Sequence, residues 1–554
     1  MTKLISKTDF ILYRECPNNV WIKIHRPDEY AKFEVSEFEK SLGKMGNEVE
    51  KLARGMFPNG VMVEGRGEEA QKLTKKLIAE KTPVIFQAVF ATDKYLAATD
   101  VLVWNKEANV YDLYEIKMSS AYDLQDEETD DFDDEPAKIS EAETLPGKGN
   151  GKPRKLNKKK EEQYEYDITF QVNVLEMCGT KINDKYLIRL NKEYKKFGPI
   201  DFTLDKLFVR ENKSEAVAKL APIALEEMER AYKYLSVENQ PNSPCPCYYK
   251  GRSAHCTAFS AINTKVPKYS VHDLNRIGGS KALLRKLLDE DILEIDQIPE
   301  DMIPPVKKPK EGEKPSKPRK LNQVRVYKTK EPIIDLEAIR AELSSLTFPL
   351  YFLDYETYPT AIPVFDGYHP YQHIVFQYSL HVLDSKDAEP RHFECIVLEG
   401  DPAEKIVASL VQNIGPIGSV ISWYKKFENS RNKELARLVP LQFEFLNSVI
   451  KRTYDLMDIV ENQYYVHPGF YGRSSIKKVF PVVAPDEERS YKTLGVKNGM
   501  EAIEAYRQIS QGELKDKDAE EKKAEMLEYC KLDTKAMYII WKFFRDLVDE
   551  AEKE

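Results

Sequence analysis

Short apolar and alternating runs along the chain predict β-strands, and these runs fall into two groups. In the first half, the runs PVIFQAVFA, YLAATDVLVW, VYDLYEIKM and KYLIRLN predict strands at residues 83–91, 95–104, 110–118 and 185–191. In the second half, the runs PLYFLDYE, HIVFQYSLHVL and GSVISWY predict strands at residues 349–356, 373–383 and 418–424.

Apolar residues at helical spacing predict helices between and after these strands. In KMGNEVEKLARGMF, residues 44–57, the side chains of Met45, Val49, Leu52 and Met56 share one face. Further helices are predicted around residues 164–178, at 214–236 and at the C-terminal 519–554. Strands and helices mixed in both halves predict an α/β protein with two domains.

Two segments of low complexity interrupt this pattern. The first, about residues 124–162, is acidic and then basic, and we expect it to be a disordered insert in the first domain. The second, residues 301–330, is rich in Pro and Lys and predicts a linker between domains at 1–300 and 331–554. Both segments contain KPRKLN. They are either solvated loops of similar composition or basic arms that hold a polyanion.

Composition narrows the class of protein. The chain has 554 residues, 32% of them charged, and a formal net charge of -9, which excludes a surface coated in basic residues but not a local basic patch. No apolar run approaches the length of a membrane span, and the start of the chain lacks the core of a signal peptide, so we expect a cytoplasmic protein without a membrane partner. Its seven cysteines are too few and too unevenly spaced for a disulfide framework.

A first group of candidate residues lies on the predicted strands of the first half. Asp100 follows the apolar run YLAAT, and Glu115 and Lys117 leave the same face of the strand VYDLYEIKM. Two carboxylates from adjacent strands can bind a divalent cation, and an amine beside them can act on a water or a phosphate. The alternative is a surface ion pair between Glu115 and Lys117, which would contribute little to the stability of the fold.

These residues resemble the motifs of a known nuclease family. Glu48, Asp100, the triplet Glu115-Ile116-Lys117 and Gln171 are similar to the motifs of RecB-like PD-(D/E)XK nucleases. The resemblance implies a restriction-endonuclease-like core in which the helix acid, the Asp and the Glu bind Mg²⁺ or Mn²⁺. It also implies that Lys117 serves the attacking water and that Gln171 helps to position the site or the DNA. Glu50 ranks second to Glu48 as the helix acid.

Four cysteines form a second candidate group. Cys245, Cys247 and Cys256 lie within PCPCYYKGRSAHC, and Cys16 lies in the opening ISKTDFILYRECP. This layout of one plus three resembles RecB-like nucleases of the AddB type, which implies a [4Fe-4S] cluster. The C-x-C spacing departs from the usual closer grouping. Zinc, with His255 as a further possible ligand, and cysteines without a ligand are the alternatives.

A second set of acids lies in the second half of the chain. Asp354 and Glu356 share a face in LYFLDYETYP, and Tyr529 and Asp533 share a face of the C-terminal helix. With Glu428 between them, this order resembles the DEDDy exonucleases of the DnaQ-like, ribonuclease H-like fold. The resemblance implies two metal ions held by the four acids and a water oriented by Tyr529.

The second motif departs from that family. A Glu, Glu428, stands where Asp is usual, and Asp455 and Asp458 in RTYDLMDIV are substitute acids.

Basic residues in FYGRSSIKKVFP are candidates for nucleic-acid contacts. Arg473, Lys477 and Lys478 could bind phosphates, and the alternative is a solvated basic turn.

Together the two resemblances predict a metal-dependent DNA nuclease with two active sites. They imply a 3′–5′ exonuclease in the C-terminal domain, and DNA repair, CRISPR adaptation or defence against foreign DNA as the setting. The alternatives are a non-catalytic scaffold that binds nucleic acid and a C-terminal site that acts on RNA.

Overall fold

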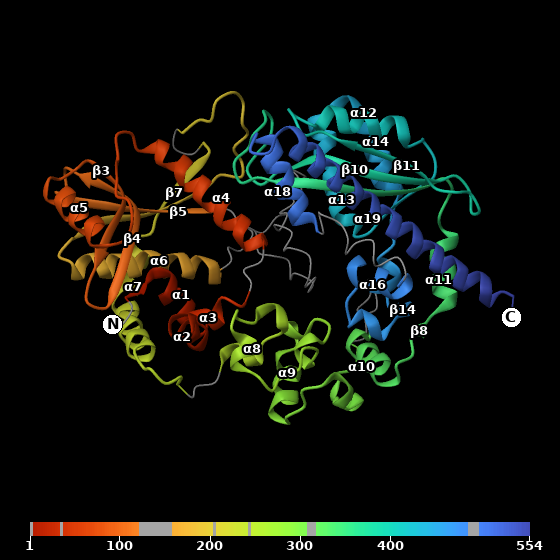
Figure 1. Cartoon of the computed structure of the whole chain (residues 1–554), viewed down its shortest axis with the longest axis horizontal. Helices are drawn as coiled ribbons and strands as arrows, with labels where there is room; N and C mark the ends of the chain where they lie inside the picture. Colours follow the sequence, from red (N-terminus) through yellow and green to blue (C-terminus); the bar gives the residue numbers. More distant parts are fainter. Residues whose placement is uncertain are drawn as a thin grey trace.

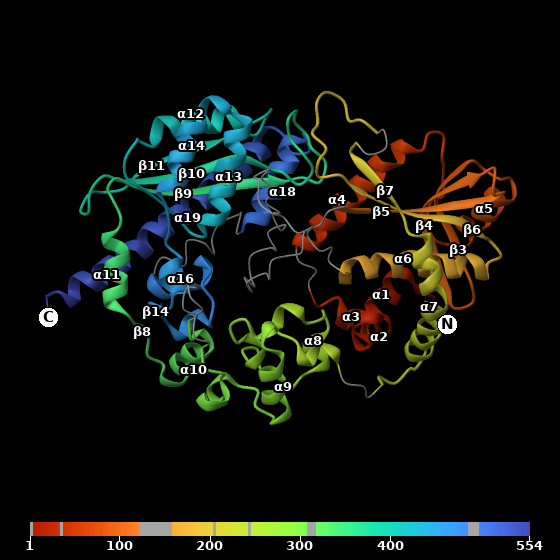
Figure 2. The ribbon, with the colours of Figure 1, turned by 180° about the vertical axis from the view of Figure 1, so that it is seen from behind.

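The computed structural model describes residues 4–33, 37–120, 158–202, 206–241, 245–306, 317–485 and 498–553. It is a mixed α/β structure with one sheet region from each half of the chain (Figure 1). A mainly helical segment, from α8 to α10, lies between the two regions on one side, and the chain termini lie at opposite ends of the long axis (Figures 1 and 2). Most of the predicted insert falls on residues outside these ranges.

The N-terminal sheet has the strand order β2-β3-β4-β5-β6-β7, and β1 pairs with β4. Strands β3, β4 and β5 are antiparallel neighbours, while β6 runs parallel to β5. The strands are β1 (Ile5–Ser6), β2 (Val61–Met62), β3 (Val84–Ala91), β4 (Tyr95–Asn105), β5 (Val110–Ser120), β6 (Ile182–Leu190) and β7 (Phe208–Asn212).

Helices cover both faces of this sheet. On one face, Leu113 of β5 belongs to the same apolar cluster as residues of α1, α6 and α7. On the other face, Tyr114 and Ile116 pack with Val49 of α4. Because side chains alternate along a strand, Glu115 and Lys117 point toward the face covered by α1 and α6. The helices are α1 (Lys7–Glu15), α2 (Pro17–His25), α3 (Pro27–Tyr30), α4 (Glu37–Ala53), η1 (Arg54–Met56), α5 (Glu68–Ala79), α6 (Lys158–Met177) and α7 (Ser214–Leu235).

Helix α6 begins at Lys158, earlier than predicted, so the last residues assigned to the insert are helical. From Tyr164 to Leu175 nearly every side chain of α6 is buried. A helix that is buried on all sides crosses the interior of its domain, so polar side chains on α6 need partners there.

The middle segment is built from short helices around their own apolar cluster, which includes Leu284, Leu287 and Ile295. The last part of the predicted linker is not extended: it forms α10, whose Val324 and Val326 are buried. The helices are η2 (Pro246–Tyr249), η3 (Arg252–Ala254), α8 (Phe259–Ile262), η4 (Val271–Asp273), η5 (Ile277–Gly279), α9 (Lys281–Asp289), η6 (Ile295–Gln297), η7 (Glu300–Met302) and α10 (Arg319–Thr329).

The C-terminal sheet has the strand order β11-β10-β9-β12-β13. Its central strand β9 is antiparallel to β10 and parallel to β12. The strands are β9 (Leu350–Pro359), β10 (His373–Leu383), β11 (Arg391–Ile396), β12 (Ser419–Ser422) and β13 (Thr453–Asp455), and a separate small sheet pairs β8 (Ile333–Ile334) with β14 (Tyr465–Val466).

Different helices cover the two faces of this sheet. Phe352 of β9 packs in a cluster with residues of α11, α16 and α19, whereas Tyr355 packs in a cluster with residues of α12, α13 and α14. The helices are α11 (Leu336–Ser344), α12 (Ala403–Asn413), α13 (Lys425–Leu438), η8 (Pro440–Gln442), α14 (Phe443–Arg452), α15 (Asp458–Glu461), η9 (Pro468–Phe470), α16 (Ile476–Val483), α18 (Gly499–Ser510) and α19 (Asp516–Ala551). Within the described ranges, no helix has the length and apolar character needed to cross a membrane.

The two sheet regions meet where α4 packs against α18 (Figure 1). Lys44 of α4 forms an ion pair of 2.7 Å with Glu504 of α18. The ring of Tyr371 packs on the apolar cluster beneath α4, and its hydroxyl donates to the carbonyl of Met118 at the end of β5. The halves are therefore joined by packed contacts as well as by the chain.

Candidate functional site

The first candidate site is centred on Glu115, which is 1% exposed. Its Oε1 accepts hydrogen bonds from Lys7 Nζ at 2.6 Å and is 2.9 Å from Lys117 Nζ. Its Oε2 accepts a hydrogen bond from Gln171 Nε2 at 2.7 Å. Burial alone would raise the pKa of Glu115, but Lys117 and Lys7 lower it to about 2. Glu115 is therefore a buried carboxylate that stays ionised.

Lys117 lies between two carboxylates. Its Nζ also forms an ion pair with Asp167, which is one turn before Gln171 on α6. Burial opposes its charge, but Glu115 and then Asp167 raise the pKa of Lys117 above its usual value. The predicted pair of Glu115 and Lys117 is thus part of an interior charge network and not a solvated surface pair.

Asp100 lies on β4, beside β5. Its Oδ2 accepts a hydrogen bond of 2.8 Å from the backbone N–H of Ile116, which fixes the carboxylate next to the Glu115 strand. Burial, and then the charge of Glu115, raise the pKa of Asp100 to about 7. The structure therefore brings the predicted Asp100, Glu115, Lys117 and Gln171 together.

The helix acid next to this group is Glu50 and not Glu48. The carboxylate of Glu50 accepts a hydrogen bond from Gln87, whose side chain also contacts Asp100. Glu48 is exposed and lies near the other domain, where its charge, after burial, raises the pKa of Tyr358. The two acids are two residues apart, about 200° around a helix, so only one of them can face Asp100.

Three residues of this site were missed by the sequence analysis: Lys7, Asp167 and Gln87. Asp167 could have been found, because its spacing of four residues from Gln171 places both on one face of α6. Gln87 is opposite Asp100 in the register that pairs Phe86 with Val101. Lys7 is 108 residues from Glu115 in the chain, and no local pattern connects them.

The second candidate site lies on β9. Asp354 and Glu356 are on the face of the sheet covered by α19, and both carboxylates, together with the Cys530 thiol of α19, lie within 4.8 Å of one another. Cys530 donates to Asp354 Oδ2 at 3.8 Å. Glu356 is buried, and the start of α18 at Gly499 lies beside its carboxylate.

Two further predicted acids act on the Cys530 thiol through their charge. Burial, and then the charges of Asp354, Glu356, Asp533 and Glu428, raise the pKa of Cys530 well above its usual value. Glu428 is buried in the first turn of α13, directly after β12, and Asp533 is one turn after Tyr529 on α19. The structure thus places Asp354 and Glu356 beside the Cys530 thiol, and the charges of Asp533 and Glu428 act on the same thiol.

The remaining predicted residues of this domain have different surroundings. The ring of Tyr529 is buried in an aromatic cluster with Tyr358, Phe376 and Tyr506. The substitute acid Asp455 accepts hydrogen bonds from the backbone N–H groups of Tyr424 and Lys425, at 2.9 and 2.8 Å.

Asp455 therefore fixes the start of α13, the helix that carries Glu428, and does not replace it. The other substitute acid, Asp458, lies 3.8 Å from Lys425 Nζ.

Arg473 does not lie where a phosphate ligand would be expected. Its guanidinium is 17% exposed and is 3.7 Å from the buried carboxylate of Asp273, in the middle segment. Arg473 thus connects two parts of the structure. Lys477 and Lys478, in the first turn of α16, are partly exposed, and their contact with nucleic acid stays a prediction.

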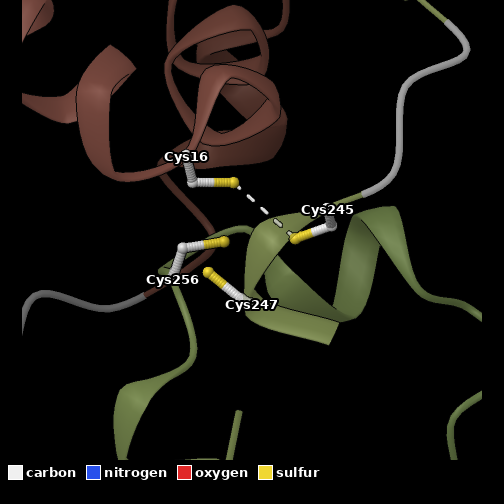
Figure 3. A group of neighbouring side chains, drawn as sticks. All are labelled: Cys16, Cys245, Cys247 and Cys256. Atoms are coloured by element: carbon white, nitrogen blue, oxygen red, sulfur yellow. Dashed lines mark hydrogen bonds between the residues drawn. The ribbon is translucent and has the colours of Figure 1, made fainter. Parts of the chain in front are cut away.

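Cys16, Cys245, Cys247 and Cys256 form a cluster in which the four sulfur atoms lie within 4.8 Å of one another. Figure 3 shows the four thiols directed toward one centre: Cys16 comes from the N-terminal helices, and the other three cysteines come from the segment drawn in green. The sulfurs of Cys16 and Cys245 are 3.6 Å apart. Sulfur contacts, first with Cys16, lower the pKa of Cys247 to about 7. Such a group could bind a metal ion.

Local structure explains how the C-x-C spacing contributes two ligands. Cys245 precedes the short helix η2 and Cys247 lies in its first turn, so both thiols turn to the same side. His255 does not join the cluster: its ring stacks on Phe259, with centroids 3.4 Å apart, and its Nε2 contacts the carbonyl of Lys250. Burial lowers the pKa of His255 to about 4.

Comparisons with known proteins add a family match and relatives without an assigned activity. A family model described as "Domain of unknown function (DUF2779)" matches residues 351–475, which include Asp354, Glu356 and Glu428. The chain is 27% identical over 252 residues to "Uncharacterized protein UU173" of Ureaplasma parvum, covering 42% of this chain and 35% of the relative. It is 29% identical over 217 residues to "Uncharacterized protein MG366" of Mycoplasma genitalium, covering 36% of this chain and 32% of the relative.

A homologue of the latter in Mycoplasma pneumoniae is 30% identical over 214 residues, again covering 36% of this chain and 32% of the relative. The chain thus spans about a third of the length of the curated relatives it matches. No solved structure matches the chain.

Proposed function

We propose that the chain is a metal-dependent nuclease with two active sites, a PD-(D/E)XK-type site in the N-terminal half and a DEDDy-type exonuclease site in the C-terminal half. The observation that carries the proposal is that Asp354 and Glu356 lie within 4.8 Å of each other beside Cys530, where the charges of Asp533 and Glu428 also act. Carboxylates brought together in a partly buried place repel one another, and divalent cations relieve that repulsion.

The donor set of the C-terminal site fits Mg²⁺ or Mn²⁺, because its members are hard carboxylate oxygens on well-packed elements. Bound there, the metal ions would supply charge stabilisation at the attacking and leaving oxygens of a phosphodiester. The chain's own contribution is to hold Asp354 and Glu356 close together on the central strand, and to carry Asp533 on α19, the helix that covers this face of the strand.

The N-terminal site supports the same class of reaction with a different set of groups. Glu115 and Asp100 are oxygen donors for a divalent cation, with Glu50 beside them. Lys117 keeps a positive charge beside Glu115, where it could stabilise negative charge that develops on a phosphate. The buried Oε1 of Gln171 has no hydrogen-bond partner among the described residues, so it can accept one from a bound water.

Nuclease assays with separate variants of the two sites test this proposal. Labelled DNA and RNA should be incubated with Mn²⁺, and a chelator should stop any cleavage. We expect Lys117→Ala and Asp354→Ala each to abolish a different part of the product pattern. Lys94→Ala and Asp384→Asn, which remove charges from ion pairs outside both sites, serve as controls.

The outcomes separate the proposal from its alternatives. Cleavage that neither variant alters would show that the sites are wrongly assigned. Binding that weakens with salt, without cleavage under any divalent cation, would favour a non-catalytic scaffold. Faster digestion of RNA than of DNA by the Asp354-dependent activity would make RNA the substrate of the C-terminal site.

We also propose that the cysteine cluster holds a resident metal centre. The resemblance to AddB-type nucleases implies a [4Fe-4S] cluster, in which each thiolate binds a separate iron. The separation of 3.6 Å between Cys16 and Cys245 is instead close to the edge of about 3.8 Å of a zinc tetrahedron with four sulfur ligands. Either centre would join the N-terminal helices to the segment that follows α7.

Metal analysis of anaerobically purified protein distinguishes the two centres. Iron with a visible absorbance shoulder supports the cluster, and one zinc per chain in a colourless sample supports zinc. The variant Cys247→Ser should lose the metal, whereas Cys178→Ser, which replaces an exposed cysteine outside the group, should retain it. A protein that contains neither metal would contradict the proposal.

A further inference from the structure

Lys7 is a second lysine in the N-terminal site, and the resemblance to nucleases gives it no role. Its Nζ is 2.6 Å from Glu115 Oε1, closer than the Nζ of Lys117 at 2.9 Å. Burial opposes its charge, but Glu115, and further Asp167 and Asp100, raise the pKa of Lys7. Lys7 is therefore a fixed cation among the carboxylates that would bind a metal.

The backbone of Lys7 is held firmly while its side chain reaches the buried carboxylate of Glu115. Ser6 caps α1 in a capping box with Asp9, and β1 pairs with β4 immediately before the helix begins. The Lys7 side chain is 22% exposed, so part of it contacts solvent while its ammonium contacts Glu115. The start of α1 therefore places the Lys7 ammonium against Glu115.

Both oxygens of Glu115 are engaged. Gln171 binds Oε2, and the two lysines share Oε1. A divalent cation needs one of these oxygens as a ligand, and a lysine ammonium so close to the same oxygen would repel it. Lys117 has a second partner in Asp167, whereas Glu115 is the one ion-pair partner of Lys7 among the described residues.

We propose that the Lys7 ammonium is the resident cation of this site and that a divalent metal must displace it from Glu115 in order to bind. This inference rests on the proposed function of the N-terminal site as a metal site. Lys7 then lowers the affinity of the site for metal and keeps its carboxylates neutralised when no metal is bound. It is a positioning residue that acts on the metal ligand Glu115.

Mn²⁺ binding to the full chain tests the proposal. The chain should carry Asp354→Asn and Glu356→Gln, so that the C-terminal acids do not contribute, and binding is followed by the electron paramagnetic resonance signal of unbound Mn²⁺. Lys7→Met keeps the apolar stem and removes the charge. We expect it to tighten Mn²⁺ binding by about 10- to 100-fold, the range that corresponds to loss of one competing charge-assisted hydrogen bond.

Two further variants complete the design. Lys7→Gln, which also lacks the charge, should shift the affinity in the same direction, so the test does not depend on one variant folding. Lys94→Met removes a lysine from the ion pair with Glu229 in the same domain and should leave Mn²⁺ affinity unchanged. Adding Glu115→Gln to Lys7→Met should abolish the tightened binding.

The outcomes distinguish this inference from the proposed function. Equal or weaker Mn²⁺ binding by both Lys7 variants overturns the inference and leaves the metal site intact. Tighter binding without cleavage of any nucleic acid supports the inference and contradicts the nuclease function of the N-terminal site. No Mn²⁺ binding by any of these chains contradicts both the inference and the proposed metal site of the N-terminal half.

Discussion

The crowded carboxylates beside Cys530 predict that the C-terminal site destabilises the metal-free protein. Asp354 and Glu356 place carboxylate oxygens within 4.8 Å of each other. Two unit charges at that distance repel by about 3.5 kcal/mol at an effective dielectric constant of 20. Solvent and neighbouring groups offset part of this energy, so we expect Asp354→Asn to raise the free energy of unfolding by about 1–2 kcal/mol in chelator. The amide oxygen of Asn can still accept the hydrogen bond from Cys530.

Urea denaturation in chelator and in Mn²⁺ measures both sides of this effect. Asp384→Asn is the control, because Asp384 is exposed and pairs with Arg391 at the surface, where loss of the pair changes stability by at most about 1 kcal/mol. Mn²⁺ bound at the C-terminal site, at 100 times the dissociation constant of that site, should contribute about 2.7 kcal/mol to the stability of the wild-type protein. Asp354→Asn should lose most of that stabilisation.

Two results would refute the reasoning. One is that Asp354→Asn is no more stable than the wild-type protein in chelator, which would mean that the carboxylates do not repel one another appreciably. The other is that Mn²⁺ stabilises the variant as much as the wild-type protein, which would mean that Asp354 is not a metal ligand.

Three further predictions concern the other candidate residues. Burial and Glu115 raise the pKa of Asp100 to about 7, so its carboxyl must lose a proton in order to bind metal. Mn²⁺ affinity at the N-terminal site should therefore rise by about tenfold per pH unit up to about pH 7 and level off above it. An affinity independent of pH would contradict this prediction. Arg473→Ala should lower the free energy of unfolding, measured in urea, by about 1 kcal/mol and leave DNA affinity unchanged, because Arg473 faces Asp273. Weaker DNA binding with unchanged stability would instead identify Arg473 as a nucleic-acid contact. Replacing Lys477 and Lys478 together by Ala should weaken DNA binding and reduce the salt slope of the binding constant by about 2; an unchanged slope would identify them as a solvated turn.

Much of the fold could be predicted because its strands carry strong local patterns. The run at residues 373–383 is strand β10 with the same bounds, and β3, β4 and β5 lie where their apolar runs predicted them. Helix α6 was predicted too short because its first turn, at Lys158–Glu161, is as charged as the insert before it. Composition does not separate a solvated helical turn from a loop.

The site could be predicted where its residues depend on the period of a single element. Alternation along β5 placed Glu115 and Lys117 together, and helical spacing placed Tyr529 beside Asp533. The helix acid could not be chosen in this way. Apolar side chains of α4 meet the N-terminal sheet, and the same helix also packs against α18. Because α4 has contacts on more than one side, the polarity of its residues does not show whether Glu48 or Glu50 faces Asp100.

Contacts between distant segments lay beyond any local pattern. Lys7 reaches Glu115 because β1 pairs with β4, a pairing of only two residues that hydrophobic periodicity does not detect. Cys530 is central to the C-terminal site because α19 crosses β9 at that residue. A cysteine next to Tyr529 in a helix otherwise suggests only a buried position.

Helix α4 has contacts with both candidate sites and so fixes their position relative to each other. Glu50 faces Asp100 in the N-terminal site, while Glu48, on the same helix, acts on Tyr358 at the end of the strand that carries Glu356. A second contact between the two halves joins the Tyr371 hydroxyl to the backbone carbonyl of Met118, the residue after Lys117. Packed contacts, and not the length of the segment at residues 301–330, therefore set the separation of the two sites. Under the proposed function, a nucleic acid that engages both sites at once must span that fixed separation.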